Sequence, residues 1–237
     1  MSVSHQFIGS LLLKHMKKNN FSMVDFGCGE GFLLNFLPLN RLKKYVGMDI
    51  NNDSISLAKK KYLKYRNISF TNINGGTQSY FAKSVKFDAI VLVGVLQYLS
   101  DKQANRVFAQ AYASLNNGGV VILSCSADHI LYKIMNIYSL IFPHKFISKI
   151  KLYDLLKKNG FVVSEITEKG VLFSPFFSNI LVFFFDAVDF MFFRNRGGLG
   201  PVGTFVRKMS EPLIRFEYRY INWIGYTIFA VGEKLKI

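Results

Sequence analysis

The sequence has few cysteines and few acidic residues. Its 237 residues include only Cys28 and Cys125, which excludes a disulfide-built scaffold and indicates a reducing compartment. Cys28 falls in a glycine-rich turn and Cys125 at a predicted strand end, so no metal site is expected. Asp and Glu number 15 against 30 Lys and Arg, which gives a formal net charge of +15. This imbalance favours an anionic partner, such as a nucleic acid, an acidic substrate or a membrane surface.

The N-terminus has no pattern of a secretory leader. The apolar run 11–13 is too short for a signal core, and no basic region precedes a long apolar stretch. We therefore expect a cytoplasmic location, with a peripheral position at the inner face of a membrane as the alternative. A helix is predicted from Ser4 to about Lys18, because apolar residues recur at helical spacing. It would either pack on the core or cover a bound ligand.

Three alternating glycines directly follow the first predicted strand. The apolar run Ser22 to Phe26 predicts a strand, and Phe32 to Leu37 predicts a helix that begins directly after the glycines. Gly27 and Gly29 allow a sharp turn and close approach of the backbone to a ligand. The N-terminus of the following helix would offer unpaired N–H groups. The turn therefore predicts a site for a polar ligand.

Two ligand classes use such a turn. A dinucleotide fingerprint has the spacing G-x-G-x-x-G and an acid about 20 residues later. This chain has G-x-G-x-G instead, with Asp25 before it and Asp49 at the end of the next strand. The run Val-Asp-Phe-Gly-Cys-Gly-Glu-Gly, followed by Gly-Met-Asp-Ile, resembles motif I and its acidic successor in class I S-adenosylmethionine-dependent methyltransferases. The resemblance implies that S-adenosylmethionine is the cofactor.

Strands and helices alternate along the first half of the chain. Further strands are predicted at 45–50, 68–71, 87–93 and 120–124. Asn52 or Asp53 is predicted to cap one helix, and Asp101 is predicted to cap the next, which Asn116 to Gly119 would end as a C-cap. This alternation predicts a doubly wound α/β sheet with right-handed crossovers. The resemblance adds that the fold is Rossmann-like with seven strands in the order 3-2-1-4-5-7-6, the last strand being antiparallel.

The resemblance also implies which residues hold the cofactor. Asp25 and the backbone from Gly27 to Gly29 would hold the amino acid end, and Asp49 would hold the ribose hydroxyls. Many relatives have an acid that contacts the adenine after the third strand. This chain has an amide there, that of Asn74 or Asn72. The predicted cofactor-binding residues are Asp25, Gly27, Cys28, Gly29, Asp49, Ile50, Asn74 and Val93. Many relatives have a histidine where Tyr98 falls, so this chain lacks that base.

An apolar and basic insertion separates the last two predicted strands, 161–166 and 226–233. Residues 1–169 and 224–237 are predicted to form the methyltransferase domain, and 170–223 the insertion. Val171 to Phe193 is long enough to span a bilayer, but Asp186 and Asp189 would each cost about 2.5–3.5 kcal/mol near its centre. We therefore predict a helix in a membrane interface or a cover over an apolar pocket.

Basic residues follow the apolar stretch and are interleaved with aromatic residues. They favour contact with an anionic membrane surface, while a core subdomain and, less favoured, nucleic-acid stacking remain alternatives. The basic residues are Arg194, Arg196, Arg207, Lys208, Arg215 and Arg219.

These features predict a methyltransferase that acts on a hydroxyl of a hydrophobic or membrane-associated small molecule, such as a lipid-linked glycan. A base is needed for a hydroxyl acceptor. We predict His129 in this role, oriented by Asp128, with a purely structural histidine as the alternative. Two other functions stay open, a non-catalytic binding protein of this fold and a methyltransferase that spans the membrane through residues 171–193.

Overall fold

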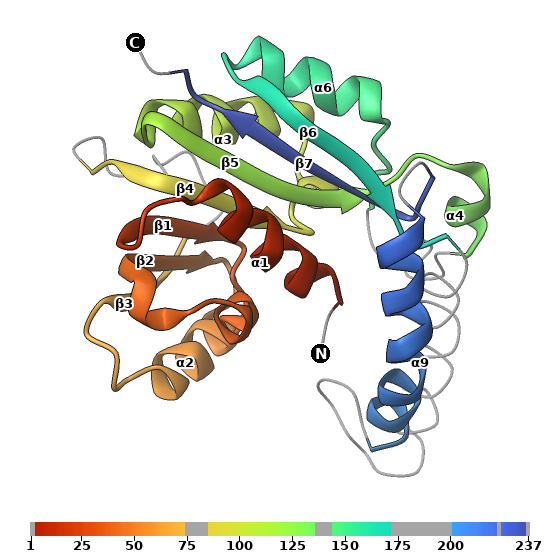
Figure 1. Cartoon of the computed structure of the whole chain (residues 1–237), viewed down its shortest axis with the longest axis horizontal. Helices are drawn as coiled ribbons and strands as arrows, with labels where there is room; N and C mark the ends of the chain where they lie inside the picture. Colours follow the sequence, from red (N-terminus) through yellow and green to blue (C-terminus); the bar gives the residue numbers. More distant parts are fainter. Residues whose placement is uncertain (1–2, 74–84, 136–143, 172–200, 222–223, 236–237) are drawn as a thin grey trace. The chain divides into compact units, whose positions relative to one another are not determined.

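The computed structural model describes residues 3–73, 85–135, 144–171, 201–221 and 224–235. Seven strands form one sheet in the order β3-β2-β1-β4-β5-β7-β6, so the predicted fold class and strand order are confirmed. Figure 1 shows β7 running opposite to its neighbours β5 and β6. The strands are β1 (Phe21–Phe26), β2 (Leu42–Asp49), β3 (Ile68–Asn72), β4 (Phe87–Val93), β5 (Leu115–Ser126), β6 (Val162–Lys169) and β7 (Thr227–Glu233).

The helices of the described residues alternate with these strands, as the sequence predicted. The α-helices are α1 (Val3–His15), α2 (Asn52–Lys61), α3 (Asp101–Ser114), α4 (Ile130–Met135), α6 (Lys149–Lys158) and α9 (Pro201–Tyr220). Three short 3₁₀ turns are η1 (Phe32–Phe36), η2 (Leu39–Arg41) and η3 (Leu96–Tyr98). Within the described ranges, no helix is both long enough and apolar enough to cross a bilayer.

The chain divides into two compact units. The larger unit contains residues 2–125, 149–166 and 229–237, and the smaller contains residue 1, 126–148 and 167–228. The predicted insertion at 170–223 therefore lies within a unit that also takes in the segment after β5. The predicted stretch Val171 to Phe193 lies outside the described residues, apart from Val171 itself. The division into a methyltransferase domain and an insertion stays a prediction.

The centre of the sheet is built from the strands with the most continuous apolar runs. Every residue of β1 is buried, and β4 is buried up to its last residue, Val93. β1 pairs in parallel with both β2 and β4, and β4 pairs in parallel with β5. A strand covered on both faces requires such a run, because neither face meets water. The sheet therefore brings the carboxyl ends of β1, β2 and β4 to one edge.

The helix predicted from Phe32 to Leu37 is present as the five-residue 3₁₀ helix η1, and it does not continue as an α-helix because Pro38 follows too soon for further turns. Two other local predictions were wrong. Asn51 caps α2 in place of Asn52 or Asp53, and Ser100 caps α3 in place of Asp101 through a capping box with Gln103. In each case the residue one position earlier has the extended backbone that a cap needs.

The boundary between α3 and β5 also differs from the prediction. The run from Asn116 to Gly119 was expected to end the helix, with the strand beginning at Val120. The strand instead begins at Leu115, directly after the helix, and includes the two glycines. Gly118 has a φ of 75°, the left-handed conformation expected of a helix C-cap. It adopts this conformation inside the strand and not at the end of the helix.

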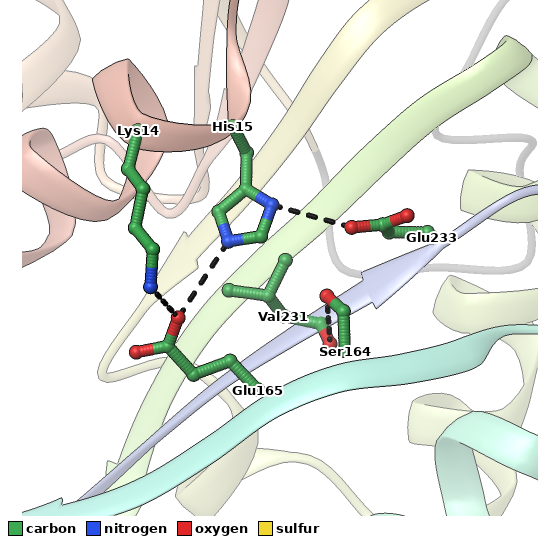
Figure 2. Close-up of polar contacts among 6 residues, drawn as sticks. All are labelled: Lys14, His15, Ser164, Glu165, Val231 and Glu233. Carbon is green, nitrogen blue, oxygen red and sulfur yellow. Dashed lines mark hydrogen bonds and ion pairs between the residues drawn. The ribbon is translucent and has the colours of Figure 1, made fainter.

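Helix α1 packs on the larger unit by an apolar face and is anchored at its last turn. Ile8, Leu11 and Leu12 are buried. Figure 2 shows the His15 side chain between Glu165 of β6 and Glu233 of β7. Its Nδ1 lies 3.3 Å from Glu233 Oε1, and its Nε2 lies 3.6 Å from Glu165 Oε2. These contacts support the packing role for α1, and its role as a cover for the cofactor stays a prediction.

Asp88, at the start of β4, accepts hydrogen bonds from three segments of the larger unit. Its Oδ2 accepts from the Ser22 N–H at 2.8 Å and from the Ser22 hydroxyl at 3.0 Å. Its Oδ1 accepts from Lys18 Nζ and Asn116 Nδ2, each at 3.0 Å. Burial alone would raise the pKa of Asp88, but these hydrogen bonds outweigh it and hold the pKa below its usual value.

We predict that Asp88→Asn destabilises the fold by about 1–3 kcal/mol at neutral pH, because its amide would face the donors that the carboxylate now accepts from. A lowered pKa contributes stability above the unfolded value of about 3.9, and this stability is lost as the pH falls through the folded value. The difference between wild type and variant should therefore shrink below about pH 4. Urea unfolding at several pH values measures it. The exposed Asp154→Asn is the control, and equal stability of the Asp88 variant at neutral pH would contradict the prediction.

Candidate active site

The glycine turn after β1 is fixed by packing on one side and open on the other. Gly27, Gly29 and Gly31 all have positive φ values, of 81°, 52° and 76°. A Cβ on Gly27 would lie 2.2 Å from Val95 Cγ2, so no side chain fits there. A Cβ on Gly29 would meet nothing closer than 3.9 Å, the distance to the Phe32 ring. The backbone at Gly29 is therefore the part of the turn that a ligand can approach.

The end of β2 holds this turn in place. The N–H groups of Gly27 and Cys28 donate to Met48 O at 2.7 and 3.0 Å. The Gly29 N–H donates to Asp49 Oδ2 at 2.8 Å, and the Asn51 N–H donates to Oδ1 at 2.9 Å. Asp49 is thus brought to the turn, as the motif predicted. Each of its oxygens accepts one backbone hydrogen bond and retains a second lone pair for a ligand hydroxyl.

Asp25 is a buried carboxylate with one oxygen unpaired. Its side chain lies near the end of β1, and the residue is 2% exposed. Tyr45 donates its hydroxyl to Oδ2 at 2.8 Å, whereas Oδ1 has no partner among the described residues. Burial raises the pKa of Asp25 to about 7, with a smaller increase from Asp49, although the Tyr45 hydrogen bond lowers it. A cationic ligand group placed at Oδ1 would offset this desolvation.

Tyr45 is a site residue that the sequence did not indicate. It is fully buried in β2 and lies next to the ring of Phe70, at 5.7 Å between centroids. Burial raises its pKa, so it remains a neutral hydrogen-bond donor to Asp25. Within the apolar run of β2, a tyrosine looked like an ordinary core residue. Only the pairing of β1 with β2 brings its hydroxyl to the carboxylate.

The other predicted cofactor residues have different surroundings. Cys28 is buried, and burial raises the pKa of its thiol, so this cysteine is not a nucleophile. Ile50 is 69% exposed beside Asp49, and Val93 ends β4 half-buried. Asn72 donates its amide to the Asp49 and Ile50 carbonyls, at 3.2 and 2.9 Å, so it joins β3 to β2. Asn74 lies outside the described residues.

The loop after β4 adds a second buried acceptor. Gln97, in η3, is 9% exposed, and its Oε1 has no hydrogen-bond partner among the described residues. Tyr98 beside it is 62% exposed. The same loop contains Val95, which packs against Gly27. The sequence pointed to Tyr98 in this loop, but the amide oxygen that lacks a partner among the described residues belongs to Gln97.

In the smaller unit, His129 is paired with a buried glutamate. His129 Nε2 lies 3.1 Å from Glu168 Oε2, which also accepts the Gly225 N–H at 3.1 Å. Glu168 is 3% exposed, whereas the His129 side chain is 36% exposed. The Tyr132 ring meets the imidazole edge-on at 5.4 Å. The imidazole is therefore oriented by two contacts and retains access to solvent.

The predicted partner of His129 was wrong. Asp128 forms an ion pair with Lys133 at 2.5 Å, one turn along α4, and Glu168 takes the orienting position instead. Glu168 is 39 residues away in the sequence. Burial raises the pKa of the neighbouring Tyr132 to about 12, with further contributions from Glu217 and Glu168, so this phenol stays neutral.

Two other histidines of the described residues, His144 and His15, have other partners. His144 Nε2 lies 2.9 Å from the Ser126 hydroxyl, and burial lowers its pKa. His15 lies between two glutamates, as described above. Within the described ranges, no group of three or more His, Cys, Asp or Glu side chains is placed to hold a metal ion.

Comparisons with known proteins agree with this geometry. Residues 24–121 match a family model described as a methyltransferase domain. Carboxy-S-adenosyl-L-methionine synthase of Campylobacter jejuni is 30% identical over 169 residues, which are 69% of this chain and 64% of the synthase. The synthase of Desulfotalea psychrophila is 30% identical over 125 residues, covering 50% of this chain and 49% of that protein. The chain thus spans less than two thirds of the length of these relatives.

Solved structures show the same fold. Magnesium protoporphyrin IX methyltransferase of Synechocystis, solved with S-adenosylhomocysteine, matches with a TM-score of 0.59 and 14% identity, covering 98% of this chain and 84% of that one. The [4+2]-cyclase SpnF matches with a TM-score of 0.63 and 14% identity, covering 98% and 81%. At such identities the likeness concerns the fold alone. The family model shows that residues 24–121 carry a methyltransferase domain, in agreement with the family predicted from the sequence, whose cofactor is S-adenosylmethionine.

Proposed function

We propose that the protein transfers the methyl group of S-adenosylmethionine to a hydroxyl of a hydrophobic or membrane-associated small molecule. The observation that carries the proposal is the glycine turn with Asp25 and Asp49 on its two sides. The unpaired Asp25 Oδ1 would accept from the ammonium of the amino acid end, together with the Gly27 to Gly29 backbone. The free lone pairs of Asp49 would accept the two ribose hydroxyls.

Proximity supplies much of the rate in such a reaction. Bound S-adenosylmethionine provides an electrophilic methyl group, so the protein chiefly has to align the acceptor oxygen with it. A hydroxyl acceptor must also lose its proton. His129 supports this assignment because Glu168 fixes its imidazole through Nε2. Nδ1, which has no partner among the described residues, would take the proton.

The position of His129 in the chain is consistent with this role. It follows the end of β5, at Ser126, by three residues. In open α/β sheets, ligands bind outside the carboxyl ends of the strands. The apolar acceptor rests on composition, since 13 of the 24 Phe lie in the last third of the chain, from Phe161 onward.

A second candidate reaction follows from the named relatives. Their name specifies a product in which S-adenosylmethionine carries a carboxyl group, so the cofactor itself is the molecule modified. Mass spectrometry of the nucleoside products distinguishes the two reactions. Methyl transfer yields S-adenosylhomocysteine, whereas the synthase reaction yields a carboxylated S-adenosylmethionine. A binding protein without catalysis would yield neither.

We predict that Asp49→Ala weakens S-adenosylmethionine binding at least about tenfold, because two charge-assisted hydrogen bonds are lost. Asp49 also holds the Gly29 N–H, so Asp49→Asn, which keeps one acceptor oxygen, should lie between wild type and Asp49→Ala. Calorimetric titration measures the dissociation constants, and the exposed Asp53→Ala on α2 is the matched control. An unchanged constant for Asp49→Ala would exclude the ribose role, and tight NADH binding would favour a dinucleotide.

We predict that cofactor affinity depends on pH through Asp25. Its raised pKa of about 7 means that the folded protein holds a proton there in mildly acidic solution, where the unfolded chain does not. Binding of an ammonium group requires the ionised form. Affinity should therefore increase about fivefold between about pH 6 and pH 7, and binding should release a proton in that range.

Asp25→Asn should remove this pH dependence and weaken binding. Calorimetry in two buffers of different ionisation enthalpy counts the released protons. The same linkage makes unliganded wild type lose stability as the pH rises from about 4 to about 7, because charging Asp25 is unfavourable in the fold. The variant should lack this loss. Wild-type binding without proton release would contradict the ammonium role of Asp25.

We predict that His129→Ala lowers turnover about 10²–10⁴-fold with unchanged cofactor affinity. Glu168→Gln should lower turnover by a smaller factor. The double variant should be no slower than His129→Ala alone, because Glu168 would act only through the imidazole. Product formation measured by mass spectrometry gives the rates. The control is His144→Ala, and full activity of His129→Ala would remove His129 from the mechanism.

A further inference from the structure

Helix α9 carries a stripe of exposed apolar side chains along its length. They recur at intervals of three and four residues and are between 42% and 64% exposed. At 100° per residue they lie within an arc of about 80°. Figure 1 shows the helix itself, in blue. The stripe consists of Phe205, Met209, Leu213, Phe216 and Tyr220.

The stripe is not the face by which α9 packs within its own unit. That face carries Ser210, Ile214, Glu217 and Tyr218, all of which are buried. On the same helical projection these residues lie on the side away from the stripe. Single exposed apolar side chains are ordinary on a protein surface, but a continuous row of five indicates a surface that binds something.

Basic residues border one edge of the stripe. Lys208, Arg215 and Arg219 are exposed and lie within an arc of about 40° next to it. Arg215 pairs with Glu211, with Nε at 3.1 Å from Oε1, and the Arg219 guanidinium lies 6.0 Å from the centre of the Tyr220 ring. The whole chain has a net charge of +15. The partner of the stripe is therefore expected to be apolar and negatively charged at once.

We propose that α9 lies in the plane of an anionic lipid membrane. The stripe would enter the boundary between headgroups and acyl chains, and Lys208 and Arg219 would meet the lipid phosphates and carboxylates. A long helix with one apolar face, one basic edge and aromatic side chains is typical of such in-plane binding. Charge complementarity favours this partner over a second copy of the chain, which is equally basic. The proposal does not rest on methyl transfer, because binding needs no turnover.

The test is flotation of the full chain with two kinds of vesicle, one of phosphatidylcholine and one of phosphatidylcholine mixed with phosphatidylserine. Wild type should float with the mixed vesicles and less with the neutral ones. Added salt should release part of the protein, because screening weakens the basic contacts but leaves the apolar ones. A protein that stays at the bottom with both kinds of vesicle would overturn the proposal.

Two double variants separate the apolar and basic contributions. Phe205→Ser with Phe216→Ser should weaken binding to both kinds of vesicle at least about tenfold. Lys208→Gln with Arg219→Gln should weaken binding to the mixed vesicles about 25-fold, since each charge contributes about fivefold, and should leave binding to neutral vesicles unchanged. All four side chains are exposed, so thermal unfolding should match that of wild type.

Matched controls lie on the exposed part of the other unit. Leu57→Ser with Leu63→Ser, and Lys59→Gln with Lys60→Gln, make the same chemical changes in and just beyond α2. These controls should float as wild type does. If the stripe variant floats equally well, the proposal is wrong. The proposal is also wrong if wild type does not bind vesicles and the stripe substitutions instead remove another interaction. That interaction could be a dimer detected by light scattering or binding to single-stranded RNA.

Discussion

The buried carboxylate of Asp25 is the constraint on which the binding end of the sheet depends. A charged group at this depth is unfavourable unless something satisfies it. Tyr45 donates to one oxygen, and no other described residue donates to the second. The turn after β1 leaves no room for a side chain at Gly27, whereas the space beside Gly29 is open. The site without ligand is therefore less stable than it would be with a bound ligand that brings a positive charge.

The second chemical element of the protein lies in the other compact unit. There the Glu168 carboxylate is buried among donors, from His129 and from the Gly225 backbone, while the imidazole reaches solvent. A buried acceptor with an exposed histidine is an arrangement that can accept a proton. The fold alone does not decide the reaction, because SpnF, a cyclase, has the same fold. The reaction therefore depends on side chains such as His129 and Glu168 and not on the fold.

The central strands and the ligand turn followed from the sequence because both depend on local patterns, whereas the strand order was implied by the resemblance to the methyltransferase family. Continuous apolar runs marked the central strands, and alternating glycines marked the turn with Asp49 at its distance. Glu168 and Tyr45 were missed for the opposite reason. Each acts through a partner on another segment, and nothing near Glu168 in the sequence distinguishes it from a solvent-facing residue. The nearby Asp128 looked like the better partner for His129, but it forms an ion pair with Lys133 of α4 instead.

Short-range competition explains the remaining differences. Only six residues separate Gly31 from Pro38, which is too few for a stable α-helix, so η1 forms instead. At the start of α3, Ser100 and Asp101 are both good caps. The glutamine three residues after Ser100 decides between them, because it completes the capping box. Such choices depend on differences of about 1 kcal/mol, below what sequence patterns resolve.

The central claim is that Asp25 receives the charged end of the cofactor. A crystal structure of the protein with S-adenosylhomocysteine tests it most directly. The account predicts that the ammonium nitrogen lies within hydrogen-bond distance of Asp25 Oδ1, with the ribose hydroxyls on Asp49. An ammonium group bound elsewhere, with Oδ1 still unpaired or facing the adenine, would contradict it.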